Sequence, residues 1–390
     1  MAYISSNANR WYCGRESAYG QIPAITASNR IPAVKLTARQ QREKTTRKDK
    51  TGSRTWQGAP AGVRKQTSFE LSTYARDWAD LTALPNHGPL FEASLGARGL
   101  LFLGGWSAAG TTDRLVKFID DHGLVPGQAV TFAGEIRFVA AVADSKSIVL
   151  NCPFSTAPAA GIKIGATATY APASELPSVS VFDYWGTGGE VQRVLTGAAV
   201  DRFKLDLNGD YHQFEFKGVA QDVVDSASFA GGEGGQTTFP TEPAGAADYS
   251  YSVVPGNLGQ VWLGAVPTQF YTVSSASIEI KNNLDLRMNE FGSVLPRAIA
   301  PGNREVNVSF ELFVQDDAAT TALYQAARQH VPIGILFQLG QVPGQMLGIY
   351  LKGVVPEVPE FDDGEKRLKW KFRDTLAQGT ADDEVFVAFG

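Results

Sequence analysis

The chain has 390 residues, of which 44% are apolar and 11% aromatic, so it has room for two or three domains with real hydrophobic cores. Its net charge of −5 gives no overall attraction to nucleic acid, and two cysteines, Cys13 and Cys152, exclude a disulfide framework or a cysteine-based zinc site. We expect no signal peptide, and no apolar run approaches the roughly 18–20 residues of a membrane span.

The first 96 residues predict an N-terminal segment, two strands and a helix. Residues 1–30 lack clear periodicity, which is typical of a disordered tail or of an arm that orders on a neighbouring subunit. Alternating apolar and polar residues at 33–36 and 67–71 predict two strands joined by a long loop. Leu90-Phe91-Glu92-Ala93 predicts a short helix after them.

The loop between these strands is strongly basic. From Lys35 to Lys65 ten basic residues stand against two acidic ones, which gives +8 here and −13 for the rest of the chain. It is either a solvated hairpin tip or a projecting loop that docks on an acidic protein or on nucleic acid. Trp56 is its only aromatic residue, so stacking on single-stranded bases is not supported and docking on protein is favoured.

We expect this loop to project and to dock on an acidic surface of another subunit. A structureless loop of ~20 residues in a compact domain is usually functional or disordered. The candidate docking residues are Arg42, Lys44, Arg47, Lys48, Lys50 and Arg54. The candidate acidic residues that would receive them are Asp201, Asp206, Asp210, Glu357, Glu360, Asp362 and Asp363.

The middle of the chain predicts an insertion and a linker. Residues 97–176 have no counterpart elsewhere in the chain and predict a small β domain, with one short helix at 115–119. Its expected role is that of a surface decoration. Residues 221–266 are rich in Gly and Pro, especially from Phe229 to Gly245, and predict a linker.

The last third of the chain repeats the pattern of the first. Residues 277–281 and 305–312 predict two strands, and Asp316-Asp317 predicts the cap of a helix from Ala318 to Gln329. Both loops end in Gly-x-Arg, both return strands read Ser-Phe-Glu-Leu, and both copies continue with a hairpin. Asn208-Gly209 and Asp363-Gly364 are strong signals for the two hairpin turns.

Five matches in the same order favour duplication of one unit. The expected domains are 1–96 with 177–220, including an N-terminal arm, and 267–390, including a C-terminal arm. We expect a mainly β fold, in which each repeat is a β-sandwich or partial barrel flanked by one helix. The acidic, alternating C-terminal segment is expected to complete a sheet in its own subunit or in a neighbour.

No catalytic constellation is evident in the sequence. The four histidines, His87, His122, His212 and His330, lack metal-ligand spacing with one another or with cysteine. The Gly-rich run at 231–235 lacks the strand-before and helix-after context of a dinucleotide site. Helix capping and turn formation explain the paired carboxylates at 316–317 and 362–363. We expect a protein that is not an enzyme and that has no cofactor and no metal.

The repeated unit resembles the tail tube proteins of long-tailed bacteriophages. The residues that carry the resemblance are 275–284, Phe291-Gly292-Ser293, Gly302-Asn303-Arg304 and, for the N-terminal arm, 16–20. It covers about 1–96 and 177–390, and the insertion departs from the minimal pattern of that family. It implies a structural protein whose rings stack into a hollow tube that carries DNA, with no catalytic residues.

Two repeats per chain then imply a homotrimeric ring with pseudo-sixfold symmetry. The basic loop is then expected to project from its own ring and dock on the next ring. The expected partners are further copies of the chain, other tail proteins such as the tape measure and the terminator, and passing double-stranded DNA without specific binding. No membrane contact is expected. The protein is expected in the virion, after assembly in the cytoplasm of the host bacterium. A baseplate hub or tail-tip component of the same fold, or a nucleic-acid-binding module that uses the basic loop, are the alternatives.

Overall fold

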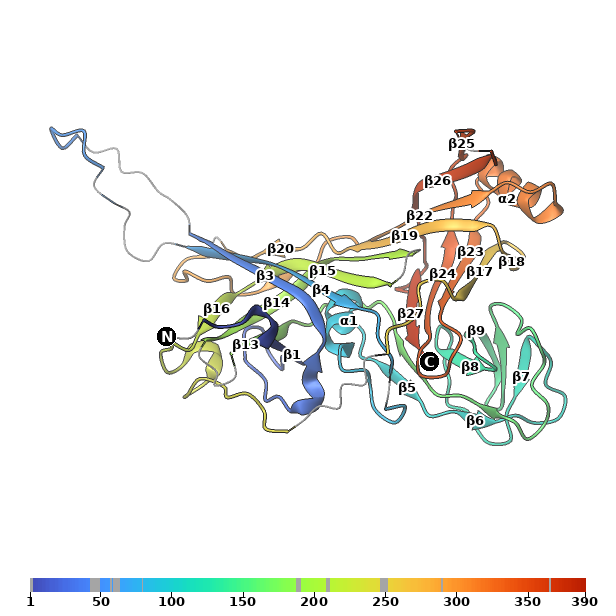
Figure 1. Ribbon diagram of the computed structural model, residues 1–390, viewed down its shortest axis with the longest axis horizontal. Coiled ribbons are helices and arrows are strands. Elements are labelled where there is room, and N and C mark those ends of the chain that lie inside the picture. Colours follow the sequence, from blue (N-terminus) through green and yellow to red (C-terminus); the bar gives the residue numbers. More distant parts are fainter. Residues whose placement is uncertain are drawn as a thin grey trace.

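A computed structural model describes residues 3–42, 50–56, 58, 64–78, 80–186, 191–207, 211–245, 252–288, 290–364 and 366–390. The chain folds into stacked antiparallel β layers (Figure 1), which confirms the expected mainly β class. The described helices are α1 (Gly88–Leu95) and α2 (Ala318–Gln329), with short 3₁₀ turns at Ser6–Ala8, Ala27–Asn29 and Glu233–Gly235.

One long sheet runs through the molecule and is here called the inner sheet. Its strands, in spatial order, are β3 (Ala33–Arg42), β4 (Lys65–Tyr74), β15 (Gln213–Ala220), the second half of β14 (Val191–Leu207), β19 (Val273–Lys281), β22 (Glu305–Phe313), β26 (Lys369–Leu376) and β25 (Glu360–Asp362). The order of the first four strands is that of the last four. In the first repeat β4 pairs with β3 on one side and with β15 on the other, and in the second repeat β22 pairs in the same way with β19 and β26.

Two outer sheets back the inner one. The first is formed by β2 (Arg30–Ile31), β1 (Arg10–Arg15), β13 (Val179–Trp185), the first half of β14 and β16 (Asp222–Asp225). The second is formed by β18 (Thr268–Phe270), β17 (Gly259–Gly264), β23 (Ile333–Leu339), β24 (Leu347–Val354), β27 (Val385–Phe389), β12 (Thr167–Tyr170) and β5 (Leu100–Phe102). The repetition therefore extends to this layer, where β1, β13, β14 and β16 correspond to β17, β23, β24 and β27.

The main core lies between these layers and continues through both repeats. Helix α1 is almost wholly buried in it, because Pro89 sets the first turn, apolar residues follow, and Gly96 ends the helix at φ 111°. The Phe91 ring packs edge-on against Phe214 of the first repeat and Phe389 of the second. Helix α1 thus joins the two repeats from inside.

Helix α2 has a different environment. The Asp317 carboxylate accepts a hydrogen bond from the backbone amide of Thr320 at 2.7 Å, which makes it the expected N-cap. The helix ends at His330, which has a left-handed φ of 54°. Leu323 and Ala327 are buried, but the opposite side of α2 faces solvent. No second repeat of this chain is left to cover that side.

Most strands of the segment inserted in the first repeat, residues 97–176, form two small sheets. The four-stranded one contains β7 (Leu115–Lys117), β10 (Ser147–Leu150), β9 (Glu135–Asp144) and β8 (Ala129–Phe132). The two-stranded one pairs β6 (Gly105–Trp106) with β11 (Lys163–Ile164). The helix predicted at 115–119 is wrong, because Leu115–Lys117 is the strand that pairs with β10 and Val116 is buried there. The period of a five-residue apolar run cannot distinguish a helix from a strand.

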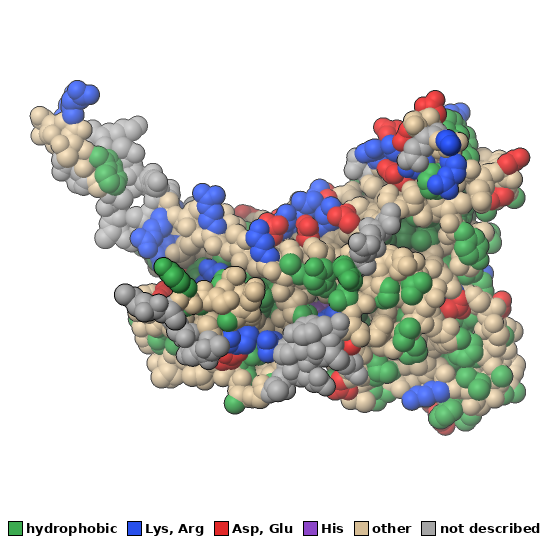
Figure 2. Space-filling view, in the orientation of Figure 1, with side chains coloured by type: hydrophobic (Ala, Val, Ile, Leu, Met, Phe, Trp, Pro, Cys, Tyr) green, Lys and Arg blue, Asp and Glu red, His purple; other side chains and the backbone are tan. Residues whose placement is uncertain are grey.

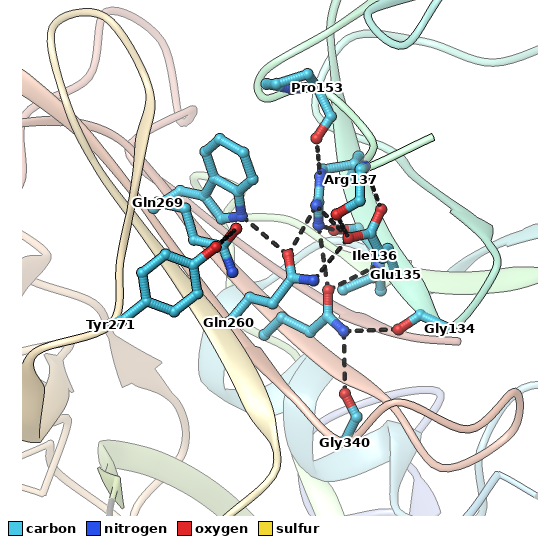
Figure 3. Close-up of polar contacts among 12 residues, drawn as sticks. Gly134, Glu135, Ile136, Arg137, Pro153, Gln260, Gln269, Tyr271 and Gly340 are labelled. Carbon is cyan, nitrogen blue, oxygen red and sulfur yellow. Dashed lines mark hydrogen bonds and ion pairs between the residues drawn. The ribbon is translucent and has the colours of Figure 1, made fainter. Parts of the chain in front are cut away.

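This inserted unit is anchored on the second repeat (Figure 3). The Arg137 guanidinium, fully buried, donates to Gln260 at 2.8 Å and to Gln338 at 3.1 Å, and lies 3.1 Å from Glu135. Gln260 and Gln338 belong to β17 and β23, so the network connects two parts of the chain more than a hundred residues apart. Strand β12, from the same expected insertion, adds directly to β27.

Two more sequence-based expectations need correction in the described part of the chain. The N-terminal segment is not a disordered tail throughout, since β1 within it pairs with β13 of the same chain. The expected linker 221–266 contributes two sheet strands, β16 and β17. The C-terminal segment completes its own subunit's sheet through β27, beside β24, which confirms the first of its two expected alternatives. Each is a short strand whose partner is distant in sequence, which local periodicity cannot reveal.

Candidate functional site: the polar sheet face, its two edges and the long loops

The exposed face of the inner sheet carries charges of both signs. Along each strand, side chains that point into the core alternate with side chains that point outward. The outward Lys and Arg residues are Lys35, Arg39, Arg202, Lys204, Lys217, Lys281, Lys369, Lys371 and Arg373. The outward Asp and Glu residues are Glu70, Asp206, Glu215, Glu279, Glu305, Glu311, Glu360 and Asp362.

Among the described side chains, nine cations and eight carboxylates make this polar face nearly neutral. They are interspersed, because the register of the strands places opposite charges side by side. Lys217 lies 3.1 Å from Glu70 on the neighbouring strand, Lys281 lies 3.2 Å from Glu279, and Arg202 contacts Glu279. Figure 2 shows blue and red side chains mixed along the hollowed upper surface. Exposed pairs of this kind contribute only about 0–1 kcal/mol each to stability. Their main effect is therefore on the net charge of the face.

The inner sheet has two edges, at β3 and at β25. In the described structure neither edge has a further strand beside it. In the middle of the sheet, the corresponding edges of the two repeats are paired with each other. There β14 of the first repeat pairs with β19 of the second over six residues. In that junction Leu205 lies opposite Ile278 and is fully buried, and Lys204 lies opposite Glu279.

The two equivalent edges differ in exposure. Leu205 pairs with Phe214 in the first hairpin, as Phe361 pairs with Trp370 in the second. Leu205 is 0% exposed, while Phe361 is 58% exposed. The chemistry is the same, but only the first repeat has a following unit to cover it. Exposed unpaired edges with apolar side chains are surfaces that natural proteins cover or pair.

The edges also differ in charge. On β25, Glu360 lies 3.1 Å from Arg373 and Asp362 lies 2.6 Å from Lys371. Hydrogen bonds from Lys371 and from the Gly364 amide lower the pKa of Asp362, so it is anionic at neutral pH. The β3 edge carries Lys35 and Arg39 on the polar face. One edge therefore presents carboxylates and the other presents cations.

The basic residues of the first loop fall partly outside the described residues. Arg42 ends β3, while Lys44, Arg47 and Lys48 lie outside the described part. Lys50 and Arg54 are exposed, and Trp56 is 69% exposed. In Figure 1 the described residues 50–56 lie well away from the rest of the molecule, beyond the β3 end of the inner sheet.

The acidic residues expected to receive this loop do not form one surface within a chain. The Asp201 carboxylate accepts a hydrogen bond from the Leu284 amide at 2.7 Å, inside the junction between the repeats. Asp206 lies on the polar face, 2.6 Å from both Lys204 and the Ser277 hydroxyl. Burial would raise the pKa of Asp206, but these two partners hold it below its usual value.

The remaining acidic candidates cluster at the other end of the sheet. Glu357, Glu360 and Asp363 are exposed and Asp362 is half-buried, all on or beside β25. Asp210 lies outside the described residues. The local sequence could not show that Asp201 and Asp206 belong to the middle of the sheet, because this follows from the pairing of β14 with β19, about 75 residues away.

The loop that joins β19 to β22 is the second repeat's counterpart of the basic loop. It contains a two-stranded unit, β20 (Asp285–Leu286) with β21 (Ile299–Ala300). It folds back over the first repeat, where the Lys65 amide donates to the Val294 carbonyl at 2.9 Å and the Gln221 side-chain amide donates to the Pro296 carbonyl at 3.1 Å. Sequence reasoning missed this contact, which involves residues with no distinctive local pattern.

The described residues give little support for a catalytic site. Among them, no group of three or more His, Cys, Asp or Glu side chains is placed to hold a metal ion. Burial lowers the pKa of His87 to about 3, with a smaller effect of Arg76, which is typical of a neutral core histidine. Burial likewise raises the pKa of Cys152 to about 12, so this thiol is unreactive. No helix in the described part is long and apolar enough to cross a membrane.

The described part of the chain thus has a repeated β unit, a long sheet with two open edges and a nearly neutral polar face. A family model described as phage tail tube protein matches residues 7–387, which is nearly the whole chain. The chain belongs to the phage tail tube protein family. This tail tube protein matches no curated protein. The assignment makes the chain a structural component of a phage tail and confirms the resemblance found in the sequence.

Proposed function

We propose that three copies of this tail tube protein close a ring with pseudo-sixfold symmetry, and that rings stack into the tube through which DNA is ejected. The observation that carries the proposal is the repeated strand order of the inner sheet. Residues 1–96 with 177–225, and 259–390, are proposed as the two equivalent tube domains, which widens the expected bounds to include β16 and β17. A heterologous contact that repeats by rotation closes into a ring, and a second contact along the axis gives a filament.

The junction inside the chain serves as a template for the contact between chains. If β25 of one subunit pairs with β3 of the next as β14 pairs with β19, the inner sheets join into one continuous barrel. This pairing would bury Phe361 as Leu205 is buried within the chain. It would also cover the solvent-facing side of α2, in the way that the second repeat covers α1.

The template also gives the register between subunits. Across the hairpins, Phe216 faces Leu71 and Phe372 faces Phe310, which makes Leu71 and Phe310 equivalent. Their partners on the edge strands, Leu36 and Ala276, are then equivalent as well. Counting along the strands from this pair, Glu360 stands opposite Arg39 of the next subunit, as Lys204 stands opposite Glu279 within the chain. Both positions pair opposite charges.

The polar face would line the channel. Its mixed charges suit a channel for DNA, because phosphate binding scales with the number of cations that the phosphates contact and whose counterions they release. Here most cations of the face already have a carboxylate neighbour. Tape measure and terminator proteins remain the proposed tail partners. The virion is the proposed location, with assembly in the host cytoplasm.

A charge-swap experiment tests ring closure. Glu360→Lys places a cation opposite Arg39, so the protein should stay folded by circular dichroism but fail to form rings in negative-stain images. Adding Arg39→Glu to that variant should restore ring formation. Assembly of Glu360→Lys at the wild-type level would contradict closure through this edge.

The symmetry of the assembled ring tests the subunit number. Cryo-electron microscopy of wild-type tubes should show three chains per ring, and six chains would replace the trimer by a hexamer. Rings that never stack, at any protein concentration, would favour a hub or tail-tip component of the same fold.

A further inference from the structure

We propose that the tip of the basic loop, around Trp56, docks on the second repeat of the neighbouring subunit in the same ring, at a surface centred on Leu376 and Gln378. This inference rests on the proposed ring and adds the partner surface of the loop. The expectation from sequence was a contact with the next ring.

The first support is the internal template of the second long loop. Loop 282–304 leaves β19, which pairs with the preceding repeat, and lies down on that same repeat. A groove of about 450 Å³ separates its residues Leu284, Leu286 and Met288 from Gln66 and Val219 of the first repeat. The β3–β4 loop has the same position relative to β3, and a similar length of 22 residues against 23.

The second support is that the equivalent receiving surface on the second repeat is uncovered. Gln221 follows β15 and packs against Gly197, and Gln378 follows β26 and packs against Gly353. Val219 is half-buried two residues before Gln221. Leu376, two residues before Gln378, is 52% exposed, and Gln378 is exposed too. An apolar side chain and an amide thus stand free where their counterparts are in contact with a loop.

An ion pair marks the two surfaces as equivalent. On the first repeat Lys65, at the start of β4, lies 3.8 Å from Asp222. On the second repeat Arg304, just before β22, lies 2.7 Å from Glu384. In both cases a cation at the end of the long loop contacts a carboxylate at the start of the outer-sheet strand that comes after the hairpin, Asp222 of β16 or Glu384 before β27. The surroundings of Gln378 therefore have the same arrangement as those of Gln221.

The third support is the chemistry of the loop itself. When the two loops are aligned from their C-terminal ends, residues 54–56 are equivalent, to within one residue, to Val294–Pro296. In the second loop, Val294 and Pro296 accept hydrogen bonds from Lys65 and Gln221. Trp56 is the exposed apolar residue of this tip and would meet Leu376. Nearby, Glu305, Asp382 and Asp383 form an acidic border. Asp382 already pairs with Arg304 and Asp383 with Lys352, so Glu305 is the carboxylate best placed to meet Lys50 and Arg54.

The geometry of the ring places this contact within one ring. Since β3 is the strand that joins the neighbouring subunit, the loop that leaves β3 reaches the second repeat of that subunit first. Figure 1 shows the described tip of the loop beyond the β3 end of the sheet, and the β19–β22 loop with β20 running toward that same end. The two loops therefore point the same way around the ring.

Disulfide trapping tests the contact. Trp56→Cys and Leu376→Cys, combined in one chain, should give cross-linked species of two and three chains in isolated rings under mild oxidation. The native Cys13 and Cys152 are buried, so the engineered thiols react selectively. The matched control combines Trp56→Cys with Val266→Cys, which is 77% exposed on the turn between β17 and β18. At least fivefold more cross-linking than the control is expected.

The outcomes separate this inference from the ring proposal. Rings that form normally but cross-link no more than the control would overturn the docking site alone. Cross-links found in stacked tubes but absent from isolated rings would show that the loop docks on the next ring, which also overturns it. If no rings form from the wild-type protein, both proposals fall.

A second measurement does not depend on cysteine chemistry. Trp56→Ala should lower the fraction of protein in rings about tenfold, while Trp56→Phe should retain most assembly because the phenyl ring can still cover Leu376. Trp56 is exposed, so neither change should alter the thermal midpoint of the unassembled subunit. Wild-type ring yield from Trp56→Ala would contradict the proposal.

Discussion

Replacing Arg137 by methionine should detach the inserted unit from the second repeat at a large energetic cost. The guanidinium is 0% exposed and makes hydrogen bonds to the Pro153 carbonyl at 2.8 Å, to Gln260 and to Gln338. It also lies between the rings of Phe154 and Trp262, with 5.1 Å to the latter. Methionine fills much of the same volume but removes every one of these donors.

The size of the effect follows from the carboxylate left behind. Burial alone would raise the pKa of Glu135, but hydrogen bonds from Ser155 and Gln260 and the charge of Arg137 hold it below its usual value. Glu135 is therefore anionic at neutral pH and nearly buried. Removing one partner of such a buried pair typically costs about 3–5 kcal/mol, because the other charge stays uncompensated.

Urea unfolding of the unassembled subunit measures this cost. Arg137→Met should lower the free energy of unfolding by about 3–5 kcal/mol. Glu135→Gln combined with Arg137→Met should recover part of the loss, since the amide needs no counterion. A loss below about 1 kcal/mol, or no recovery in the double variant, would refute the assignment of this network as a buried ionic anchor.

Three smaller predictions concern the core. Because the pKa of folded His87 is about 3, only the unfolded chain takes up a proton at His87 as the pH falls below 6.5. The free energy of unfolding should therefore drop by about 1.4 kcal/mol per pH unit. The variant His87→Leu should remove about 2 kcal/mol of the difference between pH 7 and pH 5, as measured by urea titration. Asn282→Ala removes side-chain hydrogen bonds to the Ser94 and Val200 carbonyls and should cost about 1–3 kcal/mol in the same assay. Gly197→Ala should lower the thermal midpoint, because φ is 59° and the new Cβ would lie 2.7 Å from that of Gln221.

Much of the fold could be predicted from local alternation of residues. The hairpin strands with Phe214 and Phe216, or with Ile278 and Ile280, show one apolar side chain in every two, and all four side chains are buried. The capped helix α2 was equally visible, since Asp317 precedes an amphipathic run. In both cases one short stretch contains the whole signal.

The candidate site was much harder to predict, because it depends on register between distant strands. Nothing near Lys217 in the sequence shows that Glu70 lies beside it, and nothing near Arg137 indicates Gln338, two hundred residues away. The acidic residues chosen by charge alone were split by the fold between the middle of the inner sheet and its β25 edge. Charge counts locate charged segments, while strand pairing decides which surface they share.

The differences between the two repeats follow from their positions in one chain. A subunit with one tube unit must make all its contacts with the same loop and the same helix. In a chain with two fused units, the loop and the helix of each unit can differ. Helix α1, which is covered within the chain, is buried on nearly all sides, with Phe91 fully buried and Glu92 paired with Arg15. Helix α2, whose cover would be another chain, keeps Tyr324 half-buried and has a polar outer side.

The same reasoning explains the two long loops. Loop 282–304 meets its receiving surface as soon as the chain folds, and it carries no excess of basic residues comparable with that of the first loop. The basic loop would meet its surface only when two subunits collide, so this contact depends on the concentration of subunits. Charges on its tip, opposite an acidic border, increase the rate of such encounters and not only their strength. Raising the salt concentration should therefore slow ring assembly of the wild-type protein far more than it changes the unfolding free energy of the subunit.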